Sequence, residues 1–179
     1  MLPEQLLERV LHRVIKSFCL RTPEPEVKYF DGKICLRVDG KDQGRCIGKN
    51  GIVFWALDTL MWYAGTGILR KKVRLDLLDP LVPIPKDHRM VTPFEANPNW
   101  DRQAIGQLIE ALLASCFQTT STAWSIEETK ESAAMVHLRL PFELQGAYED
   151  PNLIKAFSII IRSAGMASGV SLEIEVHWQ

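Results

Sequence analysis

One segment of the chain, residues 44–51, has the residue types needed to hold a phosphate group. Its last four residues, Gly48 to Gly51, are called the glycine loop below. The two glycines lack a Cβ and therefore let the backbone approach a ligand closely. Lys49 between them adds a positive charge, and the amides at the start of the helix expected next favour anions. The segment predicts a turn that grips an anionic ligand without covalent chemistry.

The sequence shows no set of residues arranged for catalysis. The four histidines, His12, His88, His137 and His177, are scattered over an expected helix, a linker and strands. None has a partner at the spacing of a known catalytic or metal-binding motif. Cys46, next to the glycine loop, has no histidine near it in sequence to activate its thiol. We therefore expect no enzymatic activity, no metal and no cofactor.

A proline-rich stretch divides the chain into two parts. Between residues 79 and 99 the hydrophobic periodicity is interrupted by Pro80, Pro83, Pro85, Pro93 and Pro98. Proline removes a backbone donor and disfavours helix in the residue before it. We expect one domain over residues 1–79, a linker over 80–99 and a second domain over 100–179.

The first part shows a helix, two strands, a helix and a strand. Apolar residues recur at helical spacing from Leu6 to Phe18. Two alternating segments flank Asp31-Gly32, a pair suited to the positive φ angles of a two-residue hairpin turn. A second helix is expected over residues 52–64, and a last strand over 73–77.

The second part repeats this order. A helix is expected after Asp101, a strand over residues 136–140, a helix over 153–164 and a strand over 172–176. The polar residues 127–132 are expected to form a longer hairpin loop. This recurrence predicts two similar units.

The two units align at an offset of 102 residues, but the glycine loop occurs only once. Leu36-Arg37-Val38 corresponds to Leu138-Arg139-Leu140 at that offset. The glycine loop corresponds to Asp150-Pro151-Asn152-Leu153, which lacks the glycines and the lysine. Asp150 and Pro151 suit the N-cap and the first residue of a helix. We therefore expect the second unit to be structural.

The glycine loop and its surroundings resemble the KH family, in which a G-x-x-G loop clamps the backbone of about four nucleotides. The similarity extends from Gly44 to Gly51 and to Thr59-Leu60, and it covers residues 3 to 79. It looks like the bacterial type II versions, including small single-KH proteins and the KH half of Jag-like proteins. The resemblance implies an α+β fold with two type II KH-like α-β-β-α-β units in tandem, the second degenerate. Each unit would have a three-stranded sheet with helices packed on one face.

The resemblance also implies a function and its residues. It implies binding of single-stranded RNA through Gly44, Arg45, Ile47, Gly48, Lys49, Asn50 and Gly51. Ile47 would form part of an apolar groove floor, unless it belongs to the core. Four other cations either extend a phosphate track or are solvated surface charges. They are Arg37, Lys41, Lys71 and Lys72.

The helix expected after the glycine loop begins with apolar residues, where many type II relatives have basic or polar ones. Trp55 and Trp62 lie seven residues apart and thus on one face, in addition to the core-facing stripe. They could be covered by the second unit, by a second copy of the chain, or by RNA bases. The alternative function is accordingly a protein-interaction or ribonucleoprotein-docking module that uses this tryptophan-rich helix.

Composition limits the class of protein further. The 179 residues are 46% hydrophobic with a net charge of −1. Residues 1–85 carry 14 basic and 10 acidic side chains, against 7 and 12 in the remainder, so an anionic partner favours the first part. There is no run of eighteen apolar residues, and the four cysteines lack metal-site spacing. We expect a cytoplasmic protein with reduced thiols and no membrane contact.

Overall fold

The computed structural model describes residues 1–19, 22, 24–81, 101–117, 123–130, 132–142 and 151–179. These residues form an α+β fold with two three-stranded mixed sheets and five α-helices. The helices are α1 (Pro3–Lys16), α2 (Gly40–Ile47), α3 (Ile52–Leu69), α4 (Arg102–Leu112) and α6 (Pro151–Ala167). A 3-10 turn spans Lys49–Gly51, and a π-helical turn spans Leu113–Phe117. The strands are β1 (Glu26–Phe30), β2 (Lys33–Arg37), β3 (Arg74–Leu77), β4 (Ala123–Lys130), β5 (Ala133–Leu140) and β6 (Ser171–Trp178).

The two sheets have the same topology. In the first, β1 pairs antiparallel with β2, and β2 pairs parallel with β3. In the second, β4 pairs antiparallel with β5, and β5 pairs parallel with β6. The repeated strand pattern expected from the sequence is thus confirmed at the level of a three-stranded mixed sheet in each half.

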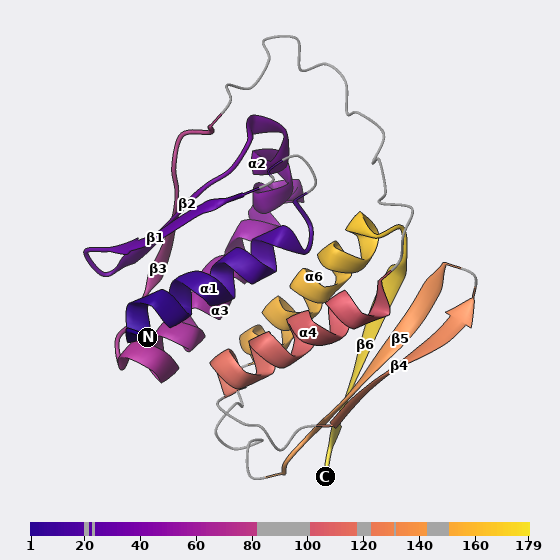
Figure 1. The fold of residues 1–179 in the computed structure, drawn as a ribbon. Coiled ribbons are helices and arrows are strands. Elements are labelled where there is room, and N and C mark those ends of the chain that lie inside the picture. The colour runs from indigo at the N-terminus through magenta and orange to yellow at the C-terminus, as the bar shows by residue number, and fades with distance from the viewer. Residues whose placement is uncertain (20–21, 23, 82–100, 118–122, 131, 143–150) are drawn as a thin grey trace.

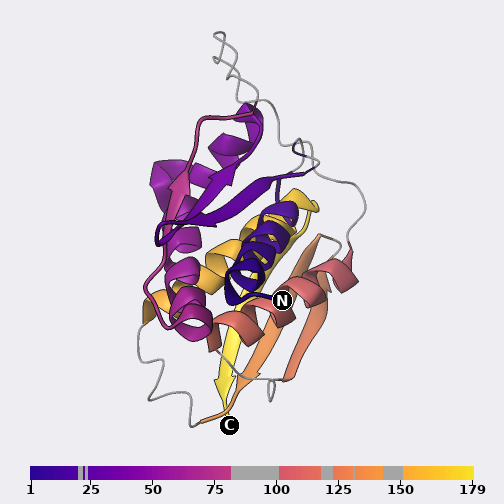
Figure 2. The ribbon, with the colours of Figure 1, turned by 60° about the vertical axis from the view of Figure 1, so that its left-hand side comes forward.

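The helices of the two halves pack against one another between the sheets (Figures 1 and 2). The helix α6 packs against α3, α4 packs against α1, and the sheets form the outer layers. The buried apolar side chains form one continuous core that draws on both halves. One contact across it joins the Cys116 thiol to the Leu60 carbonyl of α3, at 3.6 Å. The two halves therefore share a core, as one folding unit does.

Local sequence explains where several elements begin and end. Asp31 and Gly32 have φ values of 49° and 75°. Positive φ at both residues is typical of a type I′ turn, whose twist matches the right-handed twist of the two strands that it joins. Asp101 caps α4, because its side chain accepts from the amides of Gln103 and Ala104 at 2.9 and 3.3 Å. The predicted hairpin and the predicted helix start are both confirmed.

A glycine in each half lets a helix lie directly on the following strand. A Cβ on Gly65 of α3 would lie 2.5 Å from Val73 Cγ2. A Cβ on Gly165 of α6 would lie 2.5 Å from Leu172 Cγ. Both distances are shorter than any real contact, so each position needs glycine for this packing.

Two predicted segments differ from the structure in extent. The sequence predicts a loop over residues 127–132, but β4 continues to Lys130, and Glu127 pairs with Met135. An edge strand tolerates these exposed polar side chains. The helix predicted over 52–64 continues to Leu69 and ends at Arg70, which has a left-handed φ of 57°. The predicted linker over 80–99 lies almost wholly outside the described residues.

Among the described residues, the segment Lys49–Leu69 is long and apolar enough to cross a membrane by length and composition. It consists of the 3-10 turn and α3. Seven residues of α3 are buried in the core: Val53, Ala56, Leu57, Leu60, Met61, Ala64 and Gly65. A helix buried in a protein core has the same apolar composition.

Candidate nucleic-acid interface

The glycine loop lies at the junction of α2 and α3. Gly48 has φ 70° and ψ 174°, Gly51 has φ 76°, and Asn50 has φ 56°. Three of the four residues therefore have positive φ, a region that glycine, and to a lesser extent asparagine, tolerates. The Gly48 amide donates to the Gly44 carbonyl at 2.8 Å and ends α2. The result is a sharp reversal of the backbone between two helices.

Gly44, Gly48 and Gly51 differ in whether packing or backbone conformation requires glycine at the position. A Cβ on Gly48 would lie 2.4 Å from Val53 Cγ2, so close contact and positive φ both require glycine there. Gly51 has open space around it but also has positive φ. Gly44 lies within α2 with open space beside it, so packing does not require glycine at that position. The expected role of Gly44 in gripping the backbone stays a prediction.

Lys49 and Asn50 form the tip of the glycine loop, and both are exposed. Ile47 is 41% exposed and Ile52 is 43% exposed, on either side of the tip. The alternative of Ile47 as a core residue is therefore wrong. The loop thus presents a cation with apolar side chains on both flanks.

Arg45 is tied to a buried carboxylate. Its Nη1 lies 3.1 Å from Asp42 Oδ1, and the Asp42 side chain is fully buried. Asp42 also accepts from the Thr22 amide at 2.6 Å and from the Thr22 hydroxyl at 2.8 Å. This network fixes α2 to the segment that precedes β1. Arg45 keeps 22% of its side chain exposed beside the glycine loop.

A cavity of about 380 Å³ lies between the glycine loop and α6. The first half contributes Lys49, Ile52 and Val53 to its wall, and the second half contributes Ile159, Arg162 and Met166. Arg45 also lines it. The wall is mostly apolar, with cationic groups from both halves.

A second hollow lies on the other side of the loop tip. Lys49, Asn50 and Gly51 line it together with Trp55 of α3 and Lys155 of α6. Lys155 Nζ lies 5.4 Å from the centroid of the Trp55 ring, within the range of a cation–π contact. Cations of α6 thus lie on both sides of the loop.

The other predicted cations, Arg37, Lys41, Lys71 and Lys72, do not line either hollow beside the loop. Arg37 of β2 forms an ion pair with Glu26 at 2.9 Å. Lys41 is exposed in the first turn of α2. Lys71 and Lys72 follow the far end of α3, an 18-residue helix that spans about 27 Å. A phosphate track from the loop to these two lysines would have to follow the whole helix.

The tryptophans of α3 are partly covered. Trp55 packs against the core and under Lys155, which comes from the second half. Trp62 contacts Tyr63 edge-on with a 4.7 Å separation of ring centroids, and Lys72 Nζ lies 5.5 Å from its ring. Both indoles also line a shallow groove that is open to solvent. Packing by the second half therefore covers only part of this face.

Sequence reasoning missed the contribution of α6. Lys155 and Arg162 are seven residues apart, which places them on one face of a helix. That spacing was visible in the sequence. The packing of α6 against α3 was not, because it joins segments about a hundred residues apart.

The buried thiol of Cys46, in α2, contacts the buried thiol of Cys19. Cys19 Sγ is 3.6 Å from Cys46 Sγ. The hydrogen bond with Cys46 and burial raise the pKa of the Cys19 thiol far above its usual value. Burial alone raises the pKa of Cys116 to about 12. The thiols of Cys19 and Cys116 are thus poor nucleophiles at neutral pH.

No protein-family profile matches the sequence, and no curated protein matches it. Among solved structures, one described as "Crystal structure of APE1850" aligns with 97% of this chain and 97% of its own. The two chains are 13% identical, and the TM-score is 0.30. A score this low does not establish a shared fold.

Proposed function

We propose that this protein binds single-stranded RNA and that the glycine loop grips the RNA backbone. One observation carries the proposal: Gly48 and Gly51 hold Lys49 at an exposed reversal between α2 and α3. The strand order β1-β2-β3 around this loop supports the further proposal that each half is a type II KH-like unit, the second without the loop.

The loop can hold phosphate by charge and by backbone donors. Lys49 is exposed and supplies a mobile point charge. The first amides of α3 lack partners within that helix, and they carry the positive end of its dipole. Glycine at positions 48 and 51 keeps Cβ atoms away from a phosphate that approaches these amides.

The apolar side chains beside the loop favour unpaired nucleotides over a duplex. Ile47, Ile52 and Trp55 border the loop, and each keeps exposed surface. The bases of a duplex are stacked on one another, whereas those of a single strand can leave the stack and contact apolar or aromatic side chains. The site thus combines a backbone grip with surfaces for bases.

The proposal is tested by the affinity of the protein for a fluorescent single-stranded RNA of twelve nucleotides, measured by anisotropy at low salt. Lys49→Asp should weaken binding at least tenfold, because it replaces the cation with a charge that repels phosphate. Lys71→Asp is the matched control, since it makes the same charge change on an exposed lysine at the far end of α3. Equal affinities for wild type and Lys49→Asp would contradict the proposal.

A second candidate function is protein docking through α3, either to another copy of the chain or to a ribonucleoprotein. The supporting observation is the open groove lined by Trp55, Trp62 and Tyr63. Aromatic side chains in such a position are common in protein interfaces. Light scattering of the purified protein tests self-association: a dimer that Trp62→Ala converts to a monomer supports docking, and a monomer at all concentrations opposes the homodimer.

A further inference from the structure

The cavity beside the glycine loop is built by both halves of the chain. Lys49 and Ile52 approach from the first half, and Ile159, Arg162 and Met166 approach from α6. Met166 is 56% exposed, and Arg162 is also exposed, although both lie on a helix that packs against α3. An exposed apolar wall with cations at its rim is an unusual surface for a protein to leave open.

The size and chemistry of the cavity suit one unpaired nucleotide. Its volume of about 380 Å³ lies in the range of sites that enclose small ligands. The apolar side chains Ile52, Ile159 and Met166 offer contact to the face of a base. Arg162 can stack on a base or pair with a phosphate, because its guanidinium is planar and charged.

The cavity is also continuous with the loop. Gly48 and Lys49 belong to its wall, so a nucleotide in it would have its phosphate beside the loop. Lys155, seven residues before Arg162, lies on the other side of the loop tip with Trp55. A strand passing over the loop would therefore meet α6 before and after it.

We propose that α6 forms the second wall of the RNA site and that the cavity takes one unpaired nucleotide of the bound strand. The inference rests on the proposed function. It assigns the half that lacks the glycine loop a direct part in binding, through Arg162, Met166 and Lys155. It differs in this from the expectation that the second unit is structural, and the experiment below decides between the two.

The test compares RNA affinities of full-length variants in the anisotropy assay. Arg162→Ala and Met166→Glu should each weaken binding about tenfold, as loss of one stacking or charged contact does. Arg139→Ala is the control: it removes an exposed arginine of the same half, from the face of β5 opposite the buried residues. Both test positions are exposed, so the variants should keep the wild-type melting temperature.

The outcomes separate this inference from the proposed function. If Lys49→Asp weakens binding but Arg162→Ala and Met166→Glu bind as wild type does, the α6 wall is refuted and RNA binding stands. If the wild type binds no RNA, both are refuted. A thiouridine-substituted RNA gives a second readout. Crosslinks to α6 support the inference, and crosslinks confined to α2 and α3 oppose it.

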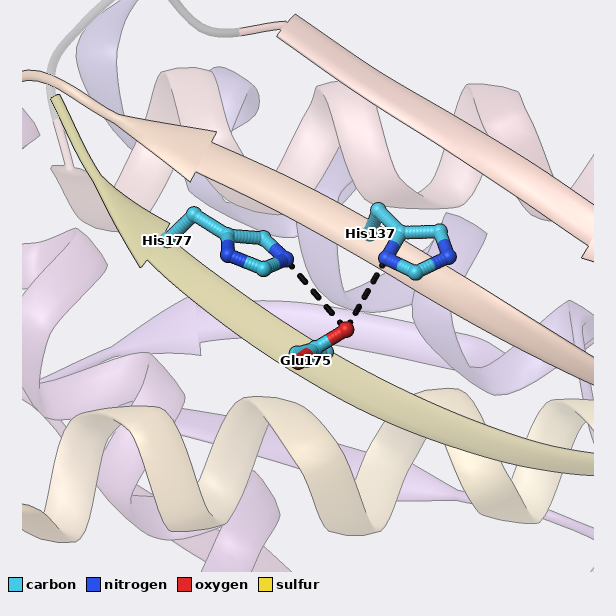
Figure 3. Close-up of side chains that lie close together, drawn as sticks. All are labelled: His137, Glu175 and His177. Atoms are coloured by element: carbon cyan, nitrogen blue, oxygen red, sulfur yellow. Dashed lines mark ion pairs between the residues drawn. The ribbon is translucent and has the colours of Figure 1, made fainter.

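The second sheet carries a cluster of two histidines and a glutamate on its outer face. Glu175 and His177 are two residues apart in β6 and therefore lie on the same face of the sheet. His137 of β5 is the register partner of Glu175. Figure 3 shows the two imidazoles directed at one carboxylate oxygen. Glu175 Oε2 lies 3.1 Å from His137 Nδ1 and 3.3 Å from His177 Nε2.

These three groups have the chemistry of a zinc site. Zinc bonds of about 2.0 Å in a tetrahedron place ligand atoms about 3.3 Å apart, close to both measured separations. The three ligand atoms all lie within 4.8 Å of one another. The other nitrogen of His137, Nε2, lies 3.3 Å from Glu127 Oε2. A carboxylate in that place orients a metal-binding histidine and selects its tautomer.

We infer that His137, Glu175 and His177 bind one divalent zinc ion, with the remaining position open to water. Titration calorimetry of the full chain with zinc chloride should show one ion bound per chain. His177→Ala should lower the affinity at least tenfold, and Glu127→Gln should lower it less. His12→Ala is the control, because His12 lies on α1 and pairs with Glu24, both in the first half of the chain. No heat of binding, or full binding in a His137→Ala/His177→Ala variant, would refute the site.

Discussion

Lys155 of α6 lies with its Nζ 5.4 Å from the centroid of the Trp55 ring of α3. This contact joins the two halves of the chain within one turn of the glycine loop, since Trp55 is the fourth residue of α3. It is compatible with the RNA grip that we propose for the glycine loop, although α3 begins with apolar residues. The cations that α3 lacks there are supplied by α6.

Gly48→Ala should destabilise the protein by about 1–3 kcal/mol, because the new Cβ would overlap Val53 and the residue has positive φ. Gly44→Ala should be neutral or stabilising by up to about 1 kcal/mol, since it lies in a helix with open space beside it. Urea denaturation of both variants measures the difference. Equal midpoints would show that the loop can relax around the methyl group.

Asp42→Ala should destabilise the protein by about 2–4 kcal/mol. The change leaves the Thr22 amide and hydroxyl without their acceptor in the interior, and it removes the carboxylate that pairs with Arg45. Asp39→Ala is a useful comparison, because it removes only the N-cap of α2, at a cost of about 1 kcal/mol. A smaller effect for Asp42→Ala than for Asp39→Ala would contradict the role of the buried network.

The protein should lose stability at alkaline pH, because the Cys116 thiol is buried. Burial raises the pKa of Cys116 in the folded protein from 9.0 to about 12. The unfolded chain therefore releases this proton at lower pH than the folded one does. The contribution of the protonated Cys116 thiol to the free energy of unfolding is fully present below pH 9 and is lost as pH rises toward about 12. The free energy of unfolding should fall more steeply over this window in wild type than in Cys116→Ala. Parallel curves would oppose the assignment.

Thermal unfolding should be a single transition. The two halves share one core, and α3 packs on α6, so neither half can unfold without exposing apolar surface of the other. Far-ultraviolet circular dichroism and tryptophan fluorescence should give the same midpoint. Two separated transitions would show that the halves unfold as independent domains.

The sequence was most informative about local structure. Asp31-Gly32 predicted the hairpin, and the spacing of glycines around Lys49 predicted the reversal between two helices, because both depend on backbone conformation at few residues. The prediction of a loop at Glu127 and Glu128 was wrong, because charged residues occur in edge strands as well as in loops. The expectation of a structural second unit came from comparing the loops alone, and that comparison does not include Arg162, which lines the cavity beside the glycine loop. Contacts between distant segments leave no periodic trace in a sequence, so the cavity beside Lys49 could not be predicted.

The most direct test of the account is the salt dependence of RNA affinity for wild type and Lys49→Ala. Each phosphate contact made by a cation contributes about −0.7 to the slope of log K against log salt for a single strand. If Lys49 contacts a phosphate, the Lys49→Ala slope should be shallower by about that amount while Lys71→Ala keeps the wild-type slope. An identical slope for wild type and Lys49→Ala would contradict the phosphate grip of the glycine loop.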